Sequence, residues 1–176
     1  MYRLRELERQ DMKTINGWRN NPEVISSLGA PFRYINLEVD ENWFDGYMRN
    51  RSNCVRCAIL DDEVLIGLVS LTGIDMFNRS AEFHIMIGET RAQNKSAGTF
   101  ATEEMLRHAF ENMNLNRIML TVLEDNKRAQ HVYEKVGFVR EGVMRKVYYK
   151  GGAYVNAILY SILSDDYITK IRGITS

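Results

Sequence analysis

Residues 85–102 read Ile85-Met86-Ile87-Gly88-Glu89-Thr90-Arg91-Ala92-Gln93-Asn94-Lys95-Ser96-Ala97-Gly98-Thr99-Phe100-Ala101-Thr102. The apolar run from Phe83 to Ile87 predicts a buried strand. Apolar residues then recur every four positions from Ala101 to Met113, which predicts one buried face of a helix. A strand, a loop of small residues and a helix aim backbone N–H groups and the positive end of the helix at one point. The sequence therefore predicts an anion site here, and phosphate is the usual anion.

The chain lacks two common phosphate motifs, the G-x-G-x-x-G pattern and the Gly-Lys-Ser/Thr of a P-loop. Residues 93–98 instead resemble motif A of the GNAT acetyltransferases, Q/R-x-x-G-x-G/A, which holds the pyrophosphate of coenzyme A. Ser96 stands where that family usually has Gly. Positive φ costs a non-glycine residue about 1 kcal/mol, so we expect a weakened or reshaped loop. The alternative interpretation of these six residues is an ordinary strand-to-helix loop.

Composition bounds the class of protein. At 176 residues the chain has the length of one domain with a substantial core, and we predict a single domain over residues 1–176. The formal net charge is zero and the basic residues are dispersed, so we expect no nucleic-acid partner. No apolar stretch has the length of a membrane span, and residues 1–5 lack the apolar core of a secretory signal. We therefore expect a cytoplasmic protein with no membrane attachment.

Cys54 and Cys57 form a C-x-x-C pair, which is compatible with a redox dithiol or half of a zinc site. No second cysteine pair exists and the three histidines are scattered along the chain. Residues 57–60 resemble a strand, in which positions 54 and 57 face opposite ways. We therefore expect two reduced structural thiols and no metal.

The remaining chain predicts an ordered series of strands and helices. Strands are expected near 4–7 and at 55–60, 64–74, 81–88, 117–123, 139–149 and 154–163, and helices at 9–19, 37–50, 101–113 and 125–136. Gly67 predicts a bulge or a close backbone approach, and Lys150-Gly151-Gly152 predicts a hairpin turn. Asp125 is the expected N-cap of the helix that stops at Gly137. This order predicts an α+β fold with a mixed, mostly antiparallel sheet of about seven strands flanked by four helices.

A second motif follows at residues 126–138. Asn126, Ala129, Tyr133, Gly137 and Phe138 keep the spacing of GNAT motif B, N-x-x-A-x-x-x-Y-x-x-x-G-F, a long and specific pattern. The chain thus resembles the GNAT superfamily over essentially its whole length. The resemblance is strongest to the branch of spermidine N-acetyltransferases, ribosomal-protein N-terminal acetyltransferases and acetyltransferases of nucleotide-linked amino sugars.

The resemblance implies a GNAT acyltransferase fold and transfer of an acetyl group from acetyl-CoA to a primary amine by direct attack. Tyr133 would be the general acid for the leaving thiolate. In the family the strand at 81–88 splays away from the strand at 117–123, and free N–H and C=O groups at Ile85 to Ile87 pair with pantetheine as a further strand would. The residues implied around acetyl-CoA are Ile85, Met86, Ile87, Gln93, Asn94, Lys95, Ser96, Ala97, Gly98, Thr99, Asn126 and Ala129.

An attacking amine must also lose a proton. An alkylamine of pKa near 10 is neutral in about one molecule per thousand at pH 7, so a group must accept or relay that proton. Glu82 and His84 lie on the same face of a strand, so the two side chains are candidates for a pair of general bases or for a relay through water. The structural alternatives are a Glu82 that satisfies neighbouring backbone groups, a His84 that lines the pocket and a Tyr133 that belongs to the core.

The sequence leaves the acceptor amine open. Acidic residues before position 46 suit the spaced cations of a polyamine, namely Glu23, Glu38, Asp40, Glu41 and Asp45. Arginines in the same region either suit an anionic handle such as a nucleotide sugar diphosphate or pair with those acids, namely Arg19, Arg33, Arg49 and Arg51. We favour a small-molecule amine over the N-terminus of a ribosomal protein. The alternative from another class is a non-catalytic, acetyl-CoA-binding regulatory domain.

The apolar final strand, residues 154–163, is expected at a margin of the sheet, where an exposed edge tends to be paired or covered. This predicts a homodimer or a larger homo-oligomer.

Overall fold

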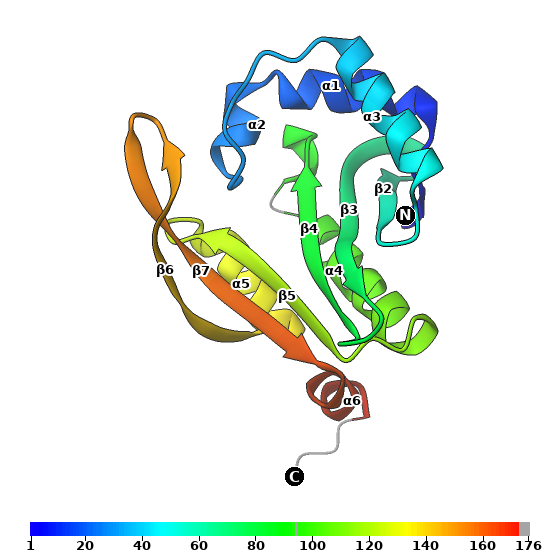
Figure 1. Ribbon diagram of the computed structural model, residues 1–176, viewed down its shortest axis with the longest axis vertical. Helices are drawn as coiled ribbons and strands as arrows, with labels where there is room; N and C mark the ends of the chain where they lie inside the picture. The colour runs from blue at the N-terminus through cyan, green and yellow to red at the C-terminus, as the bar shows by residue number, and fades with distance from the viewer. Residues whose placement is uncertain (94, 173–176) are drawn as a thin grey trace.

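The structure, a computed structural model, describes residues 1–93 and 95–172. Its centre is one seven-stranded sheet in the order β1-β2-β3-β4-β5-β7-β6 (Figure 1). The strands are β1 (Tyr2–Glu6), β2 (Val55–Asp61), β3 (Val64–Asp75), β4 (Ser80–Ile87), β5 (Arg117–Leu123), β6 (Val139–Lys150) and β7 (Ala153–Leu163). Only β4 and β5 pair in parallel; all other neighbours among the described strands are antiparallel. The predicted mixed, mostly antiparallel sheet is confirmed.

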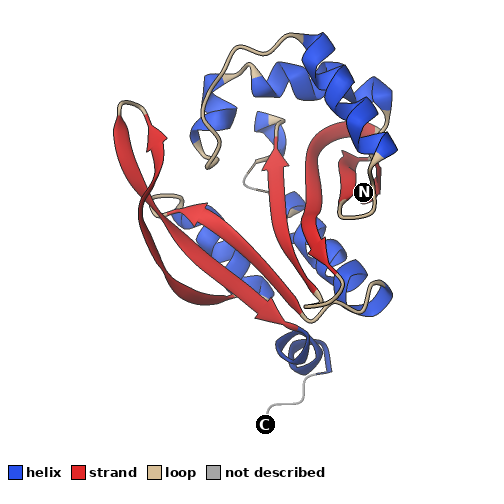
Figure 2. Cartoon of the chain, in the orientation of Figure 1, coloured by secondary structure: helices blue, strands red, loops and turns tan. Residues whose placement is uncertain are grey.

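Helices cover both faces of the sheet (Figure 2). They are α1 (Met12–Arg19), α2 (Pro22–Ser26), α3 (Leu37–Arg49), α4 (Ala97–Arg107), α5 (Lys127–Val136) and α6 (Ser164–Arg172), with 3-10 turns η1 (Arg9–Asp11) and η2 (Thr90–Ala92) and a π-helical turn η3 (His108–Asn112). No helix in the described part of the chain is long and apolar enough to cross a bilayer.

Two apolar clusters pack on the two faces of the sheet. The larger cluster joins α4 and α5 to the sheet and contains Ile59 and Phe83, whereas the smaller one joins α1 and α3 to the opposite face and contains Leu60 and Met86. Successive strand residues point to opposite faces, so β4 delivers alternate side chains to the two clusters. A side chain on β4 is therefore assigned to one face of the sheet by whether its number is odd or even.

Two helices were not predicted, α2 and α6. α2 is short, but Asn21 caps it by accepting a hydrogen bond from Glu23 N–H, and Pro22 occupies its first position. These end signals identify a helix too short for an apolar period to show. The predicted N-cap Asp125 is also wrong: Asn126 caps α5, because its side chain accepts from the N–H of Ala129 at 3.1 Å.

The final strand does not lie at the sheet margin, so that expectation is wrong. β7 pairs with β5 on one side and with β6 on the other, which leaves β6 as the edge strand. The sequence shows a hairpin between β6 and β7 but cannot show which of its two strands returns to pair with β5. The hairpin turn itself is as predicted, with Gly151 and Gly152 both at positive φ.

Gly67 lies at a bulge and at a close backbone approach, the two features predicted for its position. The register between β2 and β3 shifts beside it, and a Cβ on Gly67 would lie 2.4 Å from the carbonyl oxygen of Met86. Only a glycine allows β3 and β4 to approach so closely at this point.

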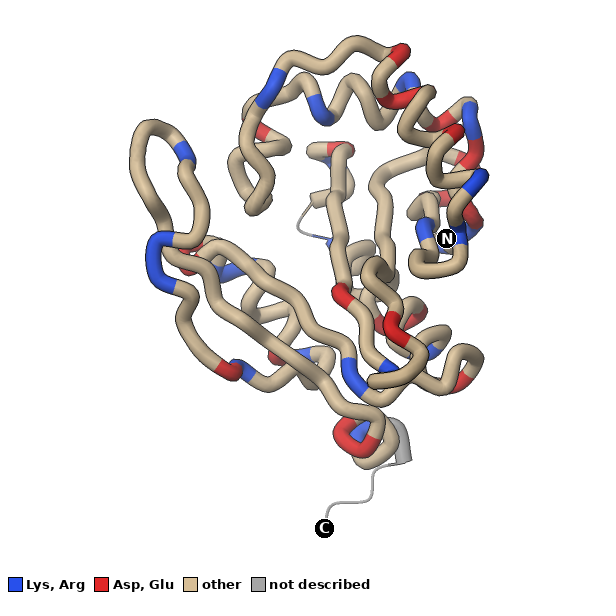
Figure 3. The backbone as a smooth tube through the Cα atoms, in the orientation of Figure 1, with Lys and Arg blue, Asp and Glu red and all other residues tan. Residues whose placement is uncertain are grey.

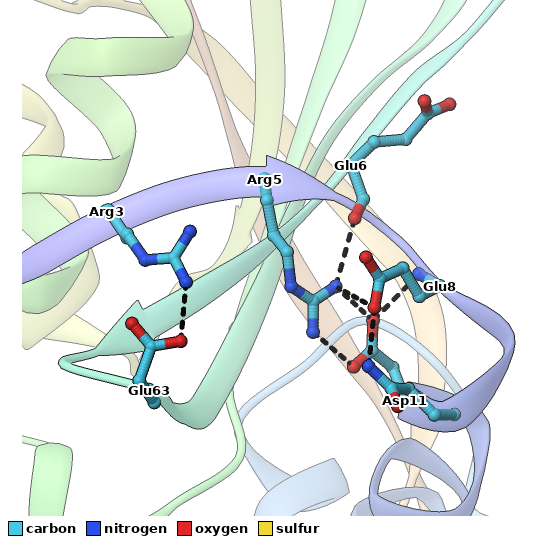
Figure 4. A network of polar contacts seen from close by, with 7 residues as sticks. Arg3, Arg5, Glu6, Glu8, Asp11 and Glu63 are labelled. Atoms are coloured by element: carbon cyan, nitrogen blue, oxygen red, sulfur yellow. Dashed lines mark hydrogen bonds and ion pairs between the residues drawn. The ribbon is translucent and has the colours of Figure 1, made fainter.

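A buried ion pair fixes the first helix to the first strand (Figure 4). Arg5 on β1 donates to both carboxylate oxygens of Asp11 at 2.7 Å, and the same carboxylate accepts from Glu8 N–H at 2.8 Å. The Asp11 side chain is only 4% exposed. Removing one partner of such a buried pair typically costs about 3–5 kcal/mol, so this pair holds the register between β1 and α1.

The parallel pairing of β4 with β5 is short. It joins Ser80 to Arg117, Ala81 to Ile118 and Glu82 to Met119, and no pair is formed beyond Glu82 among the described residues. Figure 1 shows the two strands diverging from that point. The second half of β4, residues 83–87, therefore borders a gap in the middle of the sheet.

Trp18 on α1 packs against the end of β4. A Cβ on Gly88 would lie 1.9 Å from the Trp18 ring, and the ring is only 7% exposed. The indole thus rests directly on the backbone of Gly88, and this contact sets the position of α1 relative to the loop that follows β4.

We expect Gly88→Ala to destabilise the protein, because the added methyl group displaces the Trp18 ring. Overpacking of this kind costs about 1–3 kcal/mol, and the urea midpoint of unfolding should fall accordingly. Gly17→Ala is the matched control, since Gly17 lies on α1 with nothing within 4 Å of its added Cβ. That change should stabilise the helix by about 0.5–1 kcal/mol. Equal midpoints for the two variants would contradict the packing described here.

Candidate active site

A cavity of about 750 Å³ occupies the gap between β4 and β5. Its walls come from residues 82–87 of β4, residues 121–123 of β5, the first two turns of α4 and α5, Val24 on α2 and residues 27–30 after α2. Because the strands do not pair here, the cavity is open to groups from both faces of the sheet.

The β4 side of the gap offers backbone hydrogen-bonding groups. Gly88 N–H bonds to Ile66 O, and the register pairs Met86 with Leu68 and His84 with Ser70. Antiparallel residues alternate between bonded and non-bonded pairs, so even-numbered residues bond to β3 and odd-numbered residues face β5. Ile85 and Ile87 thus turn their N–H and C=O groups to the gap. Ile87 O accepts from Gln93 Nε2 at 3.2 Å, whereas Ile85 has no strand partner on this side.

Met86 differs from its two neighbours. Its backbone bonds to β3, so the expectation that its N–H and C=O are free is wrong, and the physical reason is the alternation of the ladder. Its side chain is buried and forms part of the cavity wall.

The N-terminus of α4 borders the same cavity. The first hydrogen bond of the helix runs from Phe100 N–H to Ser96 O, so the N–H groups of Ala97, Gly98 and Thr99 have no partner within the helix. Ser96 is the N-cap residue but makes no side-chain cap bond. These amides and the positive end of α4 suit an anion.

Ser96 adopts φ −72° and ψ 0°, an ordinary helical conformation. The expected strain at Ser96 is therefore absent. Asn94 lies outside the described residues.

Only some of the residues that the sequence assigned to acetyl-CoA line the cavity. Cavity-lining positions are Ile85, Met86, Ile87, Gln93, Lys95, Gly98, Asn126 and Ala129. Ser96 and Thr99 do not line the cavity, and the fully buried side chain of Ala97 packs into the core, so these three can contribute only through their backbone. Lys95 and Arg128 add positive charge to the lining near the N-termini of α4 and α5.

Glu82 and His84 lie together on the face of the sheet that carries α1 and α3. His84 Nε2 is 3.8 Å from Glu82 Oε2 and 2.9 Å from Thr72 Oγ1. Burial lowers the pKa of His84, the nearby Arg56 guanidinium acts in the same direction, and Glu82 opposes both. His84 is therefore neutral at pH 7 and able to accept a proton beside a carboxylate.

Tyr133 approaches the cavity from the opposite face, on α5. Its ring packs edge-on against Phe83 and Phe138, and burial raises the pKa of its phenol to about 12. The hydroxyl has no hydrogen-bond partner among the described residues, although the residue lines the cavity. Tyr133 is thus a core residue by its ring and remains protonated at neutral pH, with its hydroxyl available to a ligand.

Asn126 connects α5 to the N-terminal helices. Its carbonyl oxygen caps α5, and its Nδ2 donates to Ser27 O at 3.2 Å. One side chain therefore holds the mouth of α5 and the segment after α2 together at the cavity.

Sequence reasoning missed part of the cavity wall. Residues 27–30 were not among the predicted site residues, yet all four line the cavity. Thr121 and Tyr148 were also missed; their hydroxyl oxygens are 2.9 Å apart, and this pair joins β5 to β6. No motif marks these positions, but the short Gly29-Ala30-Pro31 break before α3 was a usable sign of an irregular segment.

The acidic residues proposed for a polyamine lie elsewhere. Asp40 is 1% exposed and pairs with Arg19, while Asp45 pairs with Arg9. None of Glu23, Glu38, Asp40, Glu41 and Asp45 lines the cavity. Figure 3 shows acidic and basic residues interspersed along α1 and α3, as expected where opposite charges neutralise one another.

Cys54 and Cys57 are free thiols, and burial raises the pKa of Cys57 to about 11. A thiol held so strongly in its protonated form is a poor nucleophile. Within residues 1–93 and 95–172, no cluster of three or more potential ligands could hold a metal ion.

Comparison with known proteins places the chain among acetyltransferases. A family model described as Acetyltransferase (GNAT) domain matches residues 2–139. The spermidine N(1)-acetyltransferase of Vibrio cholerae is 32% identical over 170 residues, which are 95% of each chain. The putative ribosomal N-acetyltransferase YdaF of Bacillus subtilis is 30% identical over 115 residues, 65% of this chain and 62% of the relative.

A solved structure has the same fold. The crystal structure of spermidine N-acetyltransferase from Vibrio cholerae in complex with CoA and spermine superimposes with a TM-score of 0.89 at 31% identity, covering 95% of this chain and 98% of that one. The predicted fold is therefore confirmed.

We expect Gly98→Asp to weaken acetyl-CoA binding by about 2 kcal/mol or more, because it buries an unpaired charge beside phosphate. An acidic residue in the first turn favours the helix itself, so folding should survive. Gly98→Ala should bind as wild type, and Gly46→Asp on α3 controls for added charge, since both sites have open space. Isothermal titration measures the affinities. A folded Gly98→Asp protein with unchanged affinity would show that the pyrophosphate lies elsewhere.

Proposed function

The chain belongs to the GNAT acetyltransferase family and is an acetyl-CoA-dependent N-acetyltransferase, and we propose that its acceptor is the primary amine of a small molecule, with a polyamine as the first candidate. The observation that carries the proposal is the gap between β4 and β5, which brings Glu82 and His84 from one face and Tyr133 from the other to a single cavity.

The residues present fit acetyl-CoA, which supplies the acetyl group as a thioester. The N–H groups of Ala97, Gly98 and Thr99, which have no partner within α4, would hold the pyrophosphate, with Lys95 and Arg128 nearby. Ile85 N–H and C=O would pair with the pantetheine amides in place of the missing strand. Buried N–H and C=O groups without a hydrogen-bond partner would destabilise the protein. The gap therefore favours a ligand that carries amide groups of its own, as pantetheine does.

The two proton transfers would use side chains from opposite faces of the sheet. His84 would take the proton of the incoming ammonium, directly or through water, and Glu82 would stabilise the resulting imidazolium. Tyr133 would donate from the other face to the developing thiolate. Burial raises the pKa of the Tyr133 phenol, and it would also raise the pKa of a thiol that forms beside it. The two pKa values therefore shift in the same direction, and the phenol can still donate a proton to the thiolate.

Two lines support a polyamine. The Vibrio cholerae enzyme that was crystallised with CoA and spermine matches nearly the full length of this chain, and Glu82 supplies a carboxylate for a cationic amine inside the cavity. One observation favours a second candidate. Glu82 is the single carboxylate among the described residues that line the cavity, whereas a polyamine presents several spaced cations. A nucleotide-linked amino sugar, with one amine and an anionic handle, is therefore the second candidate.

A thiol-release assay with a panel of amines tests the proposal. The panel contains spermidine, spermine, a nucleotide-linked amino sugar and a peptide with a free N-terminus, each with saturating acetyl-CoA. We expect the highest kcat/KM with a polyamine. Turnover of the peptide alone would replace the small-molecule acceptor by a protein N-terminus. Tight acetyl-CoA binding without turnover of any amine would indicate a regulatory binding domain.

We expect Tyr133→Phe to lower kcat by about 10²-fold, the low end of the range for a general acid, with acetyl-CoA affinity close to wild type. A thiolate of pKa near 8.5 leaves partly without help, so the loss should be moderate. Tyr160→Phe is the matched control, because Tyr160 is equally buried but its hydroxyl donates to Glu134 away from the cavity. Steady-state kinetics and melting temperature are measured together. Full activity with a lower melting temperature would make Tyr133 a purely structural residue.

We also propose a homodimer or larger homo-oligomer assembled through β6. β6 is an edge strand, and exposed apolar side chains follow it at Val139, Val143, Met144, Val147 and Tyr149. Edge strands of this kind tend to be paired or covered. Light scattering at micromolar concentration should give at least the dimer mass, and Val143→Lys should reduce it. A monomeric mass for the wild-type protein would contradict the proposal.

A further inference from the structure

One wall of the cavity is held in place from the opposite half of the chain. Residues 27–30, termed the roof loop here, follow α2 and all line the cavity. Lys150, at the turn between β6 and β7, donates from Nζ to the carbonyl oxygens of Ile25 at 2.7 Å and Ala30 at 3.0 Å, and also to that of Leu28. A single ammonium group therefore bonds to three carbonyl groups in and next to the roof loop.

No carboxylate takes part in these contacts, because all three acceptors are backbone carbonyl oxygens. The Lys150 ammonium makes no ion pair with any described residue, and burial lowers its pKa, while the charge of Asp125 raises it. An ammonium has three donors, and here all three are directed at main-chain carbonyls. Such contacts fix backbone position more closely than a flexible side-chain partner would.

Tyr148 adds a second contact from the same hairpin. A Cβ on Gly29 would lie 2.9 Å from Tyr148 Cζ, so the ring packs directly on the backbone of the roof loop. The Tyr148 hydroxyl is bonded to Thr121 on β5. The ring therefore spans the distance between β5 and the roof loop, at the level where β5 has lost its pairing with β4.

An irregularity in β6 brings both residues to this position. The register with β7 shifts between Met144 and Tyr148, and Lys146 within it has φ +52°. Asn156 on β7 stabilises the irregularity by accepting from Lys146 N–H at 2.8 Å. Bulges near active sites re-aim the side chains that follow them, and the residues that follow this one are Tyr148 and Lys150.

We propose that Lys150 and Tyr148 form a latch that holds the roof loop over the acceptor side of the cavity, with Lys150 as a positioning residue that determines acceptor affinity. The inference rests on the proposed function of the cavity. The roof loop follows α2, whose Val24 packs in the same cluster as Met86, on the face that carries Glu82 and His84. Loosening the loop should therefore affect the amine more than acetyl-CoA.

The variants are Lys150→Met, which keeps the unbranched stem of the side chain and removes the ammonium donors, and Lys150→Arg, which retains a positive charge and N–H donors. Arg145→Met is the matched control, because Arg145 is an exposed cation on the same strand and makes no hydrogen bond or ion pair with another described residue. In Lys150→Met we expect the KM for the amine to rise about 10-fold or more, with a smaller change in kcat, since misplacement of a positioning wall by about 1 Å can cost 10²-fold. The KM for acetyl-CoA should stay within about twofold of wild type, and Lys150→Arg should recover most of the loss.

Amide hydrogen exchange of residues 25–30 provides a readout that does not depend on turnover. Exchange there should accelerate in Lys150→Met but not in Lys150→Arg or Arg145→Met. Unchanged exchange would overturn the latch. Faster exchange with an unchanged KM for the amine would overturn its role in acceptor binding. If the wild-type enzyme acetylates none of the amines in the panel, the proposed function fails, and the exchange data still decide whether the latch exists.

Discussion

The whole site depends on the early end of the pairing between β4 and β5. Three residue pairs join the strands, and then the sheet opens although both strands continue. Backbone N–H and C=O groups in the interior of a protein have to be bonded, and β4 beyond Glu82 can meet this requirement on its β5 side only with a ligand or a side chain. Gln93 satisfies Ile87 O in this way. The N–H and C=O of Ile85 and the N–H of Ile87 remain, and an extended chain with amide groups of its own is the ligand that suits them.

The gap also explains why the reactive groups come from opposite sides. Adjacent residues of β4 belong to different faces of the sheet, with Phe83 in the cluster of Tyr133 and Met86 in the cluster of the N-terminal helices. In a continuous sheet the two faces would be separated by backbone. Here His84, beneath α1 and α3, and Tyr133, on α5, line the same cavity. Asn126 at the N-cap of α5 and Tyr148 and Lys150 on β6 hold the segment after α2 to the other side of the opening.

Much of the fold could be predicted from the sequence because its signals are local. Gly137 and the Gly151-Gly152 pair adopt the positive φ values that their contexts predict, and the apolar runs form the predicted strands. The position of β7 between β5 and β6 could not be predicted, since it depends on long-range pairing. In the site, the motifs located the α4 loop, Asn126 and Tyr133. They could not show that Asp40 forms an ion pair with Arg19, or that Ser96 adopts an unstrained helical conformation. They also could not show that Lys150 binds a loop about 120 residues away in sequence. Ion pairs and backbone contacts of this kind depend on the folded structure.

Residue-resolved amide exchange along β4, with and without acetyl-CoA, tests the central claim most directly. The N–H groups of His84 and Met86 bond to β3 and should be protected in both states. The N–H groups of Ile85 and Ile87 face the gap, so they should exchange fast in the free protein and become protected when acetyl-CoA binds. Protection that alternates in this way would establish β4 as the strand that pairs with the ligand. Binding of acetyl-CoA without any change at Ile85 and Ile87 would contradict the account.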